Sequence, residues 1–142
     1  MRFALLFGLL LVVSGGCSSL PKPATERIQE REAAKAARLP KDPSDAAVFA
    51  ELKKAGHNFS KETKVDFYLR FPEEGAARGA LQAYSGQGYT GDVSQQQGFW
   101  ACHLQRKMVL TADEIDLARF GFRDITVNNG GEYDGWGAEV VK

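Results

Sequence analysis

Hydrophobic and polar residues alternate most regularly over residues 64–71, and a second alternating run covers residues 99–106. The first run places Val65, Phe67, Leu69 and Phe71 on one side. The second places Trp100, Cys102 and Leu104 on one side and Phe99, Ala101 and His103 on the other. A period of two predicts strands with one buried face. We expect a weaker strand over residues 89–93, a hairpin-like connection over 94–98, and a last strand from 132 to about 141.

Three stretches instead show the three-to-four-residue spacing of helices. The first covers residues 44–55, with Ser44 as its N-cap and Gly56 as its stop. The second begins at Pro72 and two glutamates and continues through Ala76, Ala80, Ala83 and Tyr84 to Gly86 or Gly88. The third begins at the capping-box pattern of residues 111–114 and carries the stripe Ile115, Ala118, Phe122 and Ile125.

After the first helix, the predicted order is strand, helix, strand, strand, helix, strand. This order predicts two helices on one face of a four-stranded antiparallel sheet. The expected fold class is therefore α+β, a ferredoxin-like sandwich preceded by an N-terminal helix.

The first residues have the features of a targeting segment. Arg2 is followed by an apolar run over residues 3–13, which is too short to span a bilayer of roughly 30 Å as a helix. Small residues then precede Cys17, as in a bacterial lipobox, although Ser14 stands where leucine is usual. We predict a lipoprotein signal peptide over residues 1–16 and a lipidated Cys17, and Ser18 favours the outer membrane.

Residues 17–43 are predicted to form a lipidated tether, flexible or partly helical. Residues 25–38 are rich in good helix formers, but their apolar positions make no continuous stripe, so a helix there would lie in solvent. Pro40 and Pro43 close the tether, and residues 44–142 form the predicted folded domain.

Composition narrows the function classes. The chain has 142 residues, two cysteines and a formal net charge of zero. We expect no disulfide framework and no global field that draws the protein to nucleic acid.

Catalytic and metal chemistry have little support. His57 and His103 are not at metal-ligand spacing, and Cys102 and His103, as strand neighbours, point to opposite faces. We therefore predict a non-enzymatic protein without a cofactor or metal. Glu132 and Asp134, two residues apart, could pair as carboxylates, but acids at a sheet end are more often solvated or bonded to backbone.

The chain ends in a glycine-rich run over residues 128–137. We expect Gly130 or Gly131 to end the third helix in the left-handed conformation, and Gly135 and Gly137 to mark a β-bulge or a close backbone approach. The run resembles the closing motif of the regulator of ribonuclease activity B (RraB) family, and the resemblance covers about residues 45–142. The resemblance implies the same fold and the role of a small cytoplasmic protein that binds ribonuclease E and lowers its activity.

The motif itself is interpreted as structural. We expect Trp136 in the core and Asp134 bonded to nearby backbone amides. The motif residues are Gly131, Glu132, Tyr133, Asp134, Gly135, Trp136 and Gly137.

A partner-binding surface is predicted on the outer face of the two central strands. Tyr68, Arg70, Phe99 and His103 would lie there, and exposed aromatic and arginine side chains are typical interface anchors. Two alternatives stay open: the face is exposed, or the tether or first helix covers it. A weaker alternative is single-stranded RNA binding, because residues 98–102 faintly resemble a strand signature of RNA recognition motifs. The leading basic residue of that signature is absent.

The two ends of the chain imply different compartments. The family resemblance implies a cytoplasmic inhibitor of ribonuclease E, whereas residues 1–17 imply export. We predict a lipid-anchored protein-binding domain in the bacterial envelope, on the outer membrane facing the periplasm, with an envelope protein as its partner. Ribonuclease E is an expected partner only if the chain is cytoplasmic.

Overall fold

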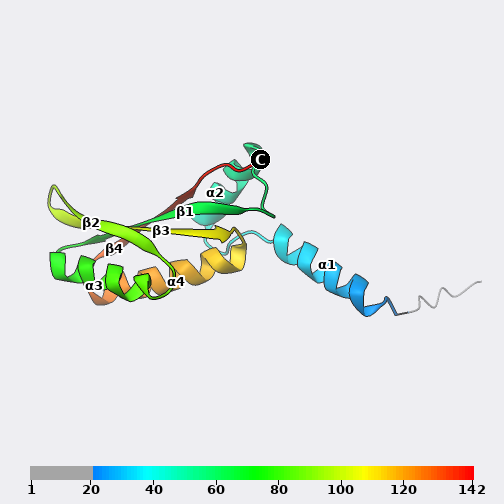
Figure 1. Ribbon diagram of the computed structural model, residues 1–142, viewed down its shortest axis with the longest axis horizontal. Coiled ribbons are helices and arrows are strands. Elements are labelled where there is room, and N and C mark those ends of the chain that lie inside the picture. Colours follow the sequence, from blue (N-terminus) through cyan, green and yellow to red (C-terminus); the bar gives the residue numbers. More distant parts are fainter. Residues whose placement is uncertain (1–20) are drawn as a thin grey trace, which may run out of the picture.

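The computed structural model describes residues 21–142, and its elements follow one another as shown in Figure 1. The helices are α1 (Ala24–Ala37), α2 (Pro43–Lys54), α3 (Glu74–Ser85) and α4 (Ala112–Asn128), and the strands are β1 (Glu62–Phe71), β2 (Thr90–Gln96), β3 (Phe99–Val109) and β4 (Glu132–Ala138). The predicted leader and Cys17 lie outside the described residues.

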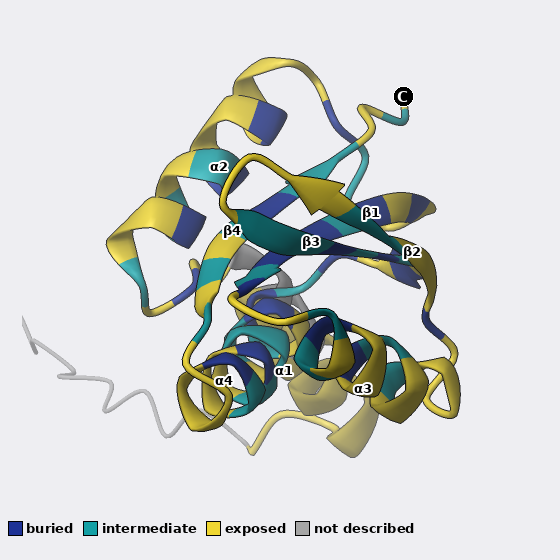
Figure 2. Cartoon of the chain, turned by 90° about the vertical axis from the view of Figure 1, so that its left-hand side faces the viewer, coloured by how far each residue is buried: buried dark blue, intermediate teal, exposed yellow. Residues whose placement is uncertain are grey.

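The four strands form one antiparallel sheet in the order β2-β3-β1-β4. Helices α3 and α4 lie side by side on one face of this sheet, and α2 lies beside β4 (Figure 2). This arrangement confirms the predicted ferredoxin-like α+β sandwich with an additional N-terminal helix. It also places β1 and β3 at the centre, as the sequence predicted.

The core fills the space between the sheet and the two helices. All four inward residues of β1 predicted from alternation are buried, namely Val65, Phe67, Leu69 and Phe71. Phe122 of α4 is fully buried, and its ring lies 4.6–5.7 Å from the rings of Phe67, Tyr84, Tyr89 and Tyr133. The predicted stripe of α4 is therefore its inward face.

Helix α2 begins one residue earlier than predicted, with Pro43 in its first turn. Its N-cap is Asp42, whose carboxylate accepts a hydrogen bond from the backbone N–H of Ser44 at 2.9 Å. The prediction of Ser44 as the cap was wrong: Pro43 takes the first helical position, so the cap is Asp42, two residues upstream of Ser44. Phe49 of α2 packs edge-on against Trp136 of β4, at 5.7 Å between ring centroids.

Other element boundaries also shift. Pro72 was predicted to open α3, but it lies outside the helix because the N-cap is Glu73. Of the predicted inward residues of α3, Ala80 is buried and Ala83 is exposed, and Ala77 is also buried. Strand β2 runs on through Gln96, so the hairpin turn is shorter than predicted and contains Gly98 at φ 87°. Thr111 is the N-cap of α4, and its hydroxyl accepts the N–H of Glu114 at 3.2 Å, which is one of the two hydrogen bonds of the predicted capping box.

Helix α1 lies in solvent, as predicted for the tether, and extends away from the domain (Figure 1). Directly after it, Arg38 forms ion pairs with Asp113 and Asp116 of α4. The backbone N–H of Lys41 also bonds Asp116 at 2.9 Å. These contacts attach the end of the tether to α4. Among the helices of residues 21–142, none has the length and apolar character needed to span a bilayer.

Candidate functional site: the outer face of the sheet

The outer face of the sheet, opposite α3 and α4, brings the four predicted interface residues together in two stacked pairs. Tyr68 of β1 lies directly opposite His103 of β3, and their rings stack at 5.1 Å with an interplanar angle of 6°. The guanidinium of Arg70 lies 5.2 Å from the ring centroid of Phe99. Tyr68 remains 46% exposed. Within residues 21–142, neither the tether nor α2 covers this face, so the first of the two alternatives holds for the described chain.

Arg70 is held by the acids of the closing motif. Its Nη2 lies 2.6 Å from Asp134 and 3.3 Å from Glu132. The prediction that Asp134 bonds backbone amides was wrong: its carboxylate accepts a hydrogen bond from the Arg70 side chain. Glu132 and Asp134 are therefore counter-ions of one arginine. The hydrogen bond and charge of Asp134, together with the charge of Glu132, raise the pKa of Arg70.

A polar group next to Tyr68 was not selected from the sequence. Asp66 Oδ1 lies 2.9 Å from His103 Nε2 and 2.7 Å from Gln105 Nε2, and Asp92 lies 3.4 Å from His103 Nδ1. The alternation of residues 64–71 does place Asp66 on the outer side with Tyr68. The contact with β2 through Asp92 depends on the register between β2 and β3, which the sequence did not reveal.

The closing motif contains the bulge predicted at Gly135. Leu69 pairs with Tyr133 and Tyr68 pairs with Gly135, so Asp134 is the extra residue, and Gly135 has φ 116°. Gly137 marks neither a bulge nor a close approach, because it pairs in register and a Cβ built on it meets nothing within 4 Å. The bulge turns Tyr133 and Trp136, three residues apart, toward the same inner side. Trp136 is buried, as predicted.

These two aromatic residues surround a buried ion pair that the sequence did not predict. Asp45 of α2 is 2% exposed and accepts hydrogen bonds from Arg119 Nε at 2.6 Å, Arg119 Nη2 at 2.9 Å and Trp136 Nε1 at 2.9 Å. Arg119 also lies 5.4 Å from the Tyr133 ring centroid, and burial raises the pKa of Tyr133 well above its usual value. This Asp45–Arg119–Trp136 cluster joins α2, α4 and β4, and Trp136 of the motif is one of its members.

The residues considered for catalysis are held in structural settings. Cys102 is buried, and burial raises its thiol pKa to about 11, which makes the nucleophilic thiolate scarce at neutral pH. His103 is on the opposite face, as predicted. His57 is buried, and its Nδ1 accepts the backbone N–H of Val141 at 3.1 Å. Residues 21–142 contain no cluster of three side chains suited to hold a metal ion.

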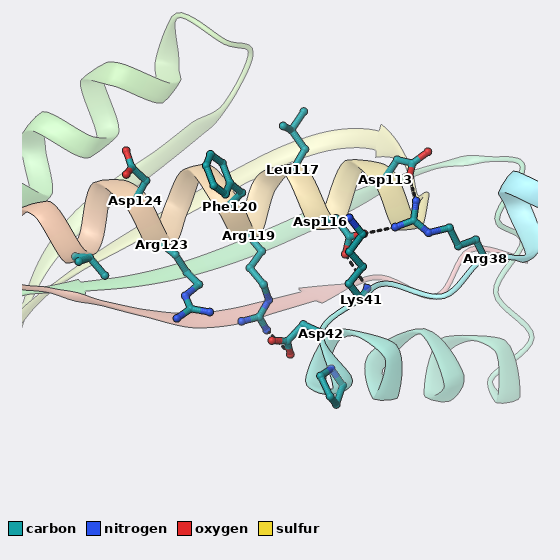
Figure 3. Close-up of a pocket in the computed structure, with 12 residues that line it drawn as sticks. Arg38, Lys41, Asp42, Asp113, Asp116, Leu117, Arg119, Phe120, Arg123 and Asp124 are labelled. Atoms are coloured by element: carbon teal, nitrogen blue, oxygen red, sulfur yellow. Dashed lines mark hydrogen bonds and ion pairs between the residues drawn. The ribbon is translucent and has the colours of Figure 1, made fainter.

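A second exposed surface lies along α4, where a groove of about 930 Å³ runs past the end of the tether. Figure 3 shows Leu117 and Phe120 pointing away from the helix, with Arg38 bonded to Asp113 and Arg119 near Asp42. Phe120 is 73% exposed, and Val127 on the same helix is similarly exposed. The sequence reading assigned only the inward stripe of α4 and did not identify this outward one.

The fold and the face define a class of protein: a small α+β domain with an open sheet surface that carries aromatic side chains. The family model described as "Regulator of ribonuclease activity B" matches residues 43–138, and the chain belongs to this family. A search of curated proteins returns no match to the chain. The family is one of regulators, so the domain is a regulatory protein-binding domain.

Proposed function

We propose that the protein is a lipid-anchored, non-enzymatic regulatory domain of the bacterial envelope that binds a protein partner through the outer face of its sheet. The observation that carries the interface is the pair of stacks on that face, Tyr68 with His103 and Arg70 with Phe99. Aromatic and arginine side chains that are already ordered lose little conformational entropy on binding.

The anchor is supported by the order of segments along the chain. A basic residue, an apolar run and small residues precede Cys17. Helix α1 then lies between that cysteine and the domain in the sequence, and the Arg38 ion pair attaches the end of the tether to α4. Acyl chains on Cys17 would hold the protein at a membrane, because two chains are sufficient for stable anchoring. The tether would keep the outer face accessible.

This proposal separates the chain from cytoplasmic ribonuclease E by a bilayer, so its partner would be an envelope protein. The second candidate function is regulation of ribonuclease E in the cytoplasm, which is the role that the sequence resemblance implies. The outer face holds six acids but only three basic residues, which disfavours RNA as its ligand. The acids are Glu62, Asp66, Asp92, Glu132, Asp134 and Glu139, and the bases are Lys64, Arg70 and Lys107.

The anchor predicts an all-or-none change in the Cys17→Ser variant. Cells grown with a clickable fatty acid should label the wild-type protein, whereas the variant should carry no label and leave the membrane fraction. Cys102→Ser is the matched control, because its thiol is buried and should not be acylated. Equal labelling of wild type and Cys17→Ser, or labelling of neither, would contradict acylation of Cys17 and leave the cytoplasmic candidate function.

The interface predicts a position-specific cross-link. A photoreactive amino acid at Phe99 of the full chain, in living cells, should capture a protein partner on illumination. The same group at Gln82, an exposed position of α3, should capture none. Tyr68→Ala should weaken the Phe99 product several-fold, in the range of an interface anchor. A Phe99 position that yields no protein product would rule out this face as the interface.

A further inference from the structure

A hollow of about 300 Å³ lies on the outer face of the sheet between its two stacked pairs. The floor of this hollow is Ala101 of β3. One wall is His103 with Tyr68, and the other is Phe99 with Arg70. Most of the lining surface is apolar. We call this space the Ala101 hollow.

The hollow exists because a small residue separates two rings on one strand. Phe99, Ala101 and His103 alternate along β3 and therefore share the outer face. The residue directly opposite Ala101 on β2 is Ser94, which is also small. The residue opposite Ala101 on β1 is Arg70, whose guanidinium lies against the Phe99 ring and the acids of β4. Neither neighbour fills the space above the Ala101 methyl group.

The spacing of the two rings along β3 suits one further ring between them. Residues two apart on one face of an antiparallel strand are separated by about 7 Å. A ring above Ala101 would therefore have Phe99 on one side and His103 on the other, each at about that distance. Aromatic pairs in proteins have ring centroids roughly 4.5–7 Å apart. An aromatic occupant would thus complete a row of three rings.

The charged side chains that line the hollow already have partners within the described chain. Arg70 Nη2 lies 2.6 Å from Asp134. The two ring nitrogens of His103 lie 2.9 Å from Asp66 and 3.4 Å from Asp92. A charged occupant would lose its hydration and meet no unpaired counter-ion among these lining residues. The hollow therefore favours an uncharged occupant.

We propose that the Ala101 hollow binds one uncharged aromatic side chain of the protein partner, such as phenylalanine, with its ring between Phe99 and His103. An aromatic side chain in a pocket near the centre of an interface is a common anchor of protein complexes. A nucleobase is also flat, but its phosphates would be repelled by the acids of this face. The hollow lies within the proposed interface, so this site rests on the proposed function.

The binding test uses the full chain in detergent micelles and a blocked glycine-serine peptide with one central phenylalanine. Two matched peptides carry cyclohexylalanine, which has a similar shape without an aromatic ring, or lysine. The phenylalanine peptide should shift the amide resonances of Ala101 and His103. The cyclohexylalanine peptide should bind roughly two- to ten-fold more weakly, because it forms no aromatic pairs, and the lysine peptide should cause no shift. Equally tight binding of either matched peptide, or no shift with the phenylalanine peptide, would overturn the aromatic site.

Ala101→Leu should abolish binding of the phenylalanine peptide, because the larger side chain occupies the hollow. Thermal unfolding should show that this variant melts no lower than the wild type. Lys107→Leu introduces the same side chain at an exposed position on the same face of β3, and it should bind the peptide normally. Tetrauridylate should cause no shift. Unaltered binding by Ala101→Leu, or shifts with tetrauridylate that Ala101→Leu abolishes, would overturn the aromatic side chain as the occupant.

The cross-link at Phe99 separates this site from the proposed function. Loss of the Phe99 product in Ala101→Leu, with the product retained in Lys107→Leu, supports the aromatic site. A product that persists in Ala101→Leu overturns the aromatic site and leaves the proposed interface intact. Absence of the product in the wild-type chain overturns the proposed interface and, with it, a partner's side chain as the occupant.

Discussion

Replacing Asp45 with alanine is expected to lower the free energy of unfolding by about 3–5 kcal/mol, the usual cost of removing one partner from a buried ion pair. Asp45 is almost completely buried and accepts both hydrogen bonds of Arg119 and the indole N–H of Trp136. Its loss would leave the Arg119 charge and the Trp136 donor without their partner. Urea unfolding followed by tryptophan fluorescence would measure the change.

Two variants calibrate the Asp45 prediction. Asp113→Ala removes an acid that pairs with Arg38 at the surface, and it should cost no more than about 1 kcal/mol. Trp136→Phe keeps the ring but removes one donor, and it should cost about 1–3 kcal/mol. If Asp45→Ala were no more destabilising than Asp113→Ala, the cluster would not be a major stabilising feature.

The Phe122→Ala variant should lose about 3–5 kcal/mol of stability, because it opens a cavity at the centre of the core. The Phe122 ring contacts four other aromatic rings from β1, α3, the segment before β2, and β4. Surrounding side chains on a sheet and two helices cannot all move inward to fill the space. Thermal and urea unfolding should both report the loss.

Phe120→Ala is the matched control, since the same change is made two residues away on the same helix. Phe120 is 73% exposed, so its replacement should change stability by no more than about 0.5 kcal/mol. Similar losses for Phe120 and Phe122 would mean that α4 is rotated relative to the orientation described above.

The sequence was most informative where a short periodic pattern decides which residues share a face. The alternation of residues 64–71 predicted the buried side of β1, and the spacing of Ile115 and Phe122 predicted the inward side of α4. The sequence also predicted the conformational role of two glycines: Gly130 follows α4 with a positive φ, and Gly135 lies at the bulge. These features depend on backbone geometry within a few residues.

The sequence did not predict side-chain contacts between residues that are far apart in the chain. Asp134 was expected to bond local backbone, but β1 places Arg70 within 2.6 Å of it. Asp45 showed no local feature that separates it from an ordinary acid in the first turn of a helix. Its burial arises because Arg119 and Trp136, 74 and 91 residues away in sequence, converge on it.

The class of fold and the family could be predicted without a structure, because hydrophobic periodicity and a glycine-rich motif are properties of consecutive residues. The tertiary structure alone decided that the outer face is uncovered within residues 21–142, that Asp66 joins His103 beside Tyr68, and that a hollow remains above Ala101. These facts follow from the register of β1 against its two neighbours, and register is set by the packing of the whole sheet against its helices.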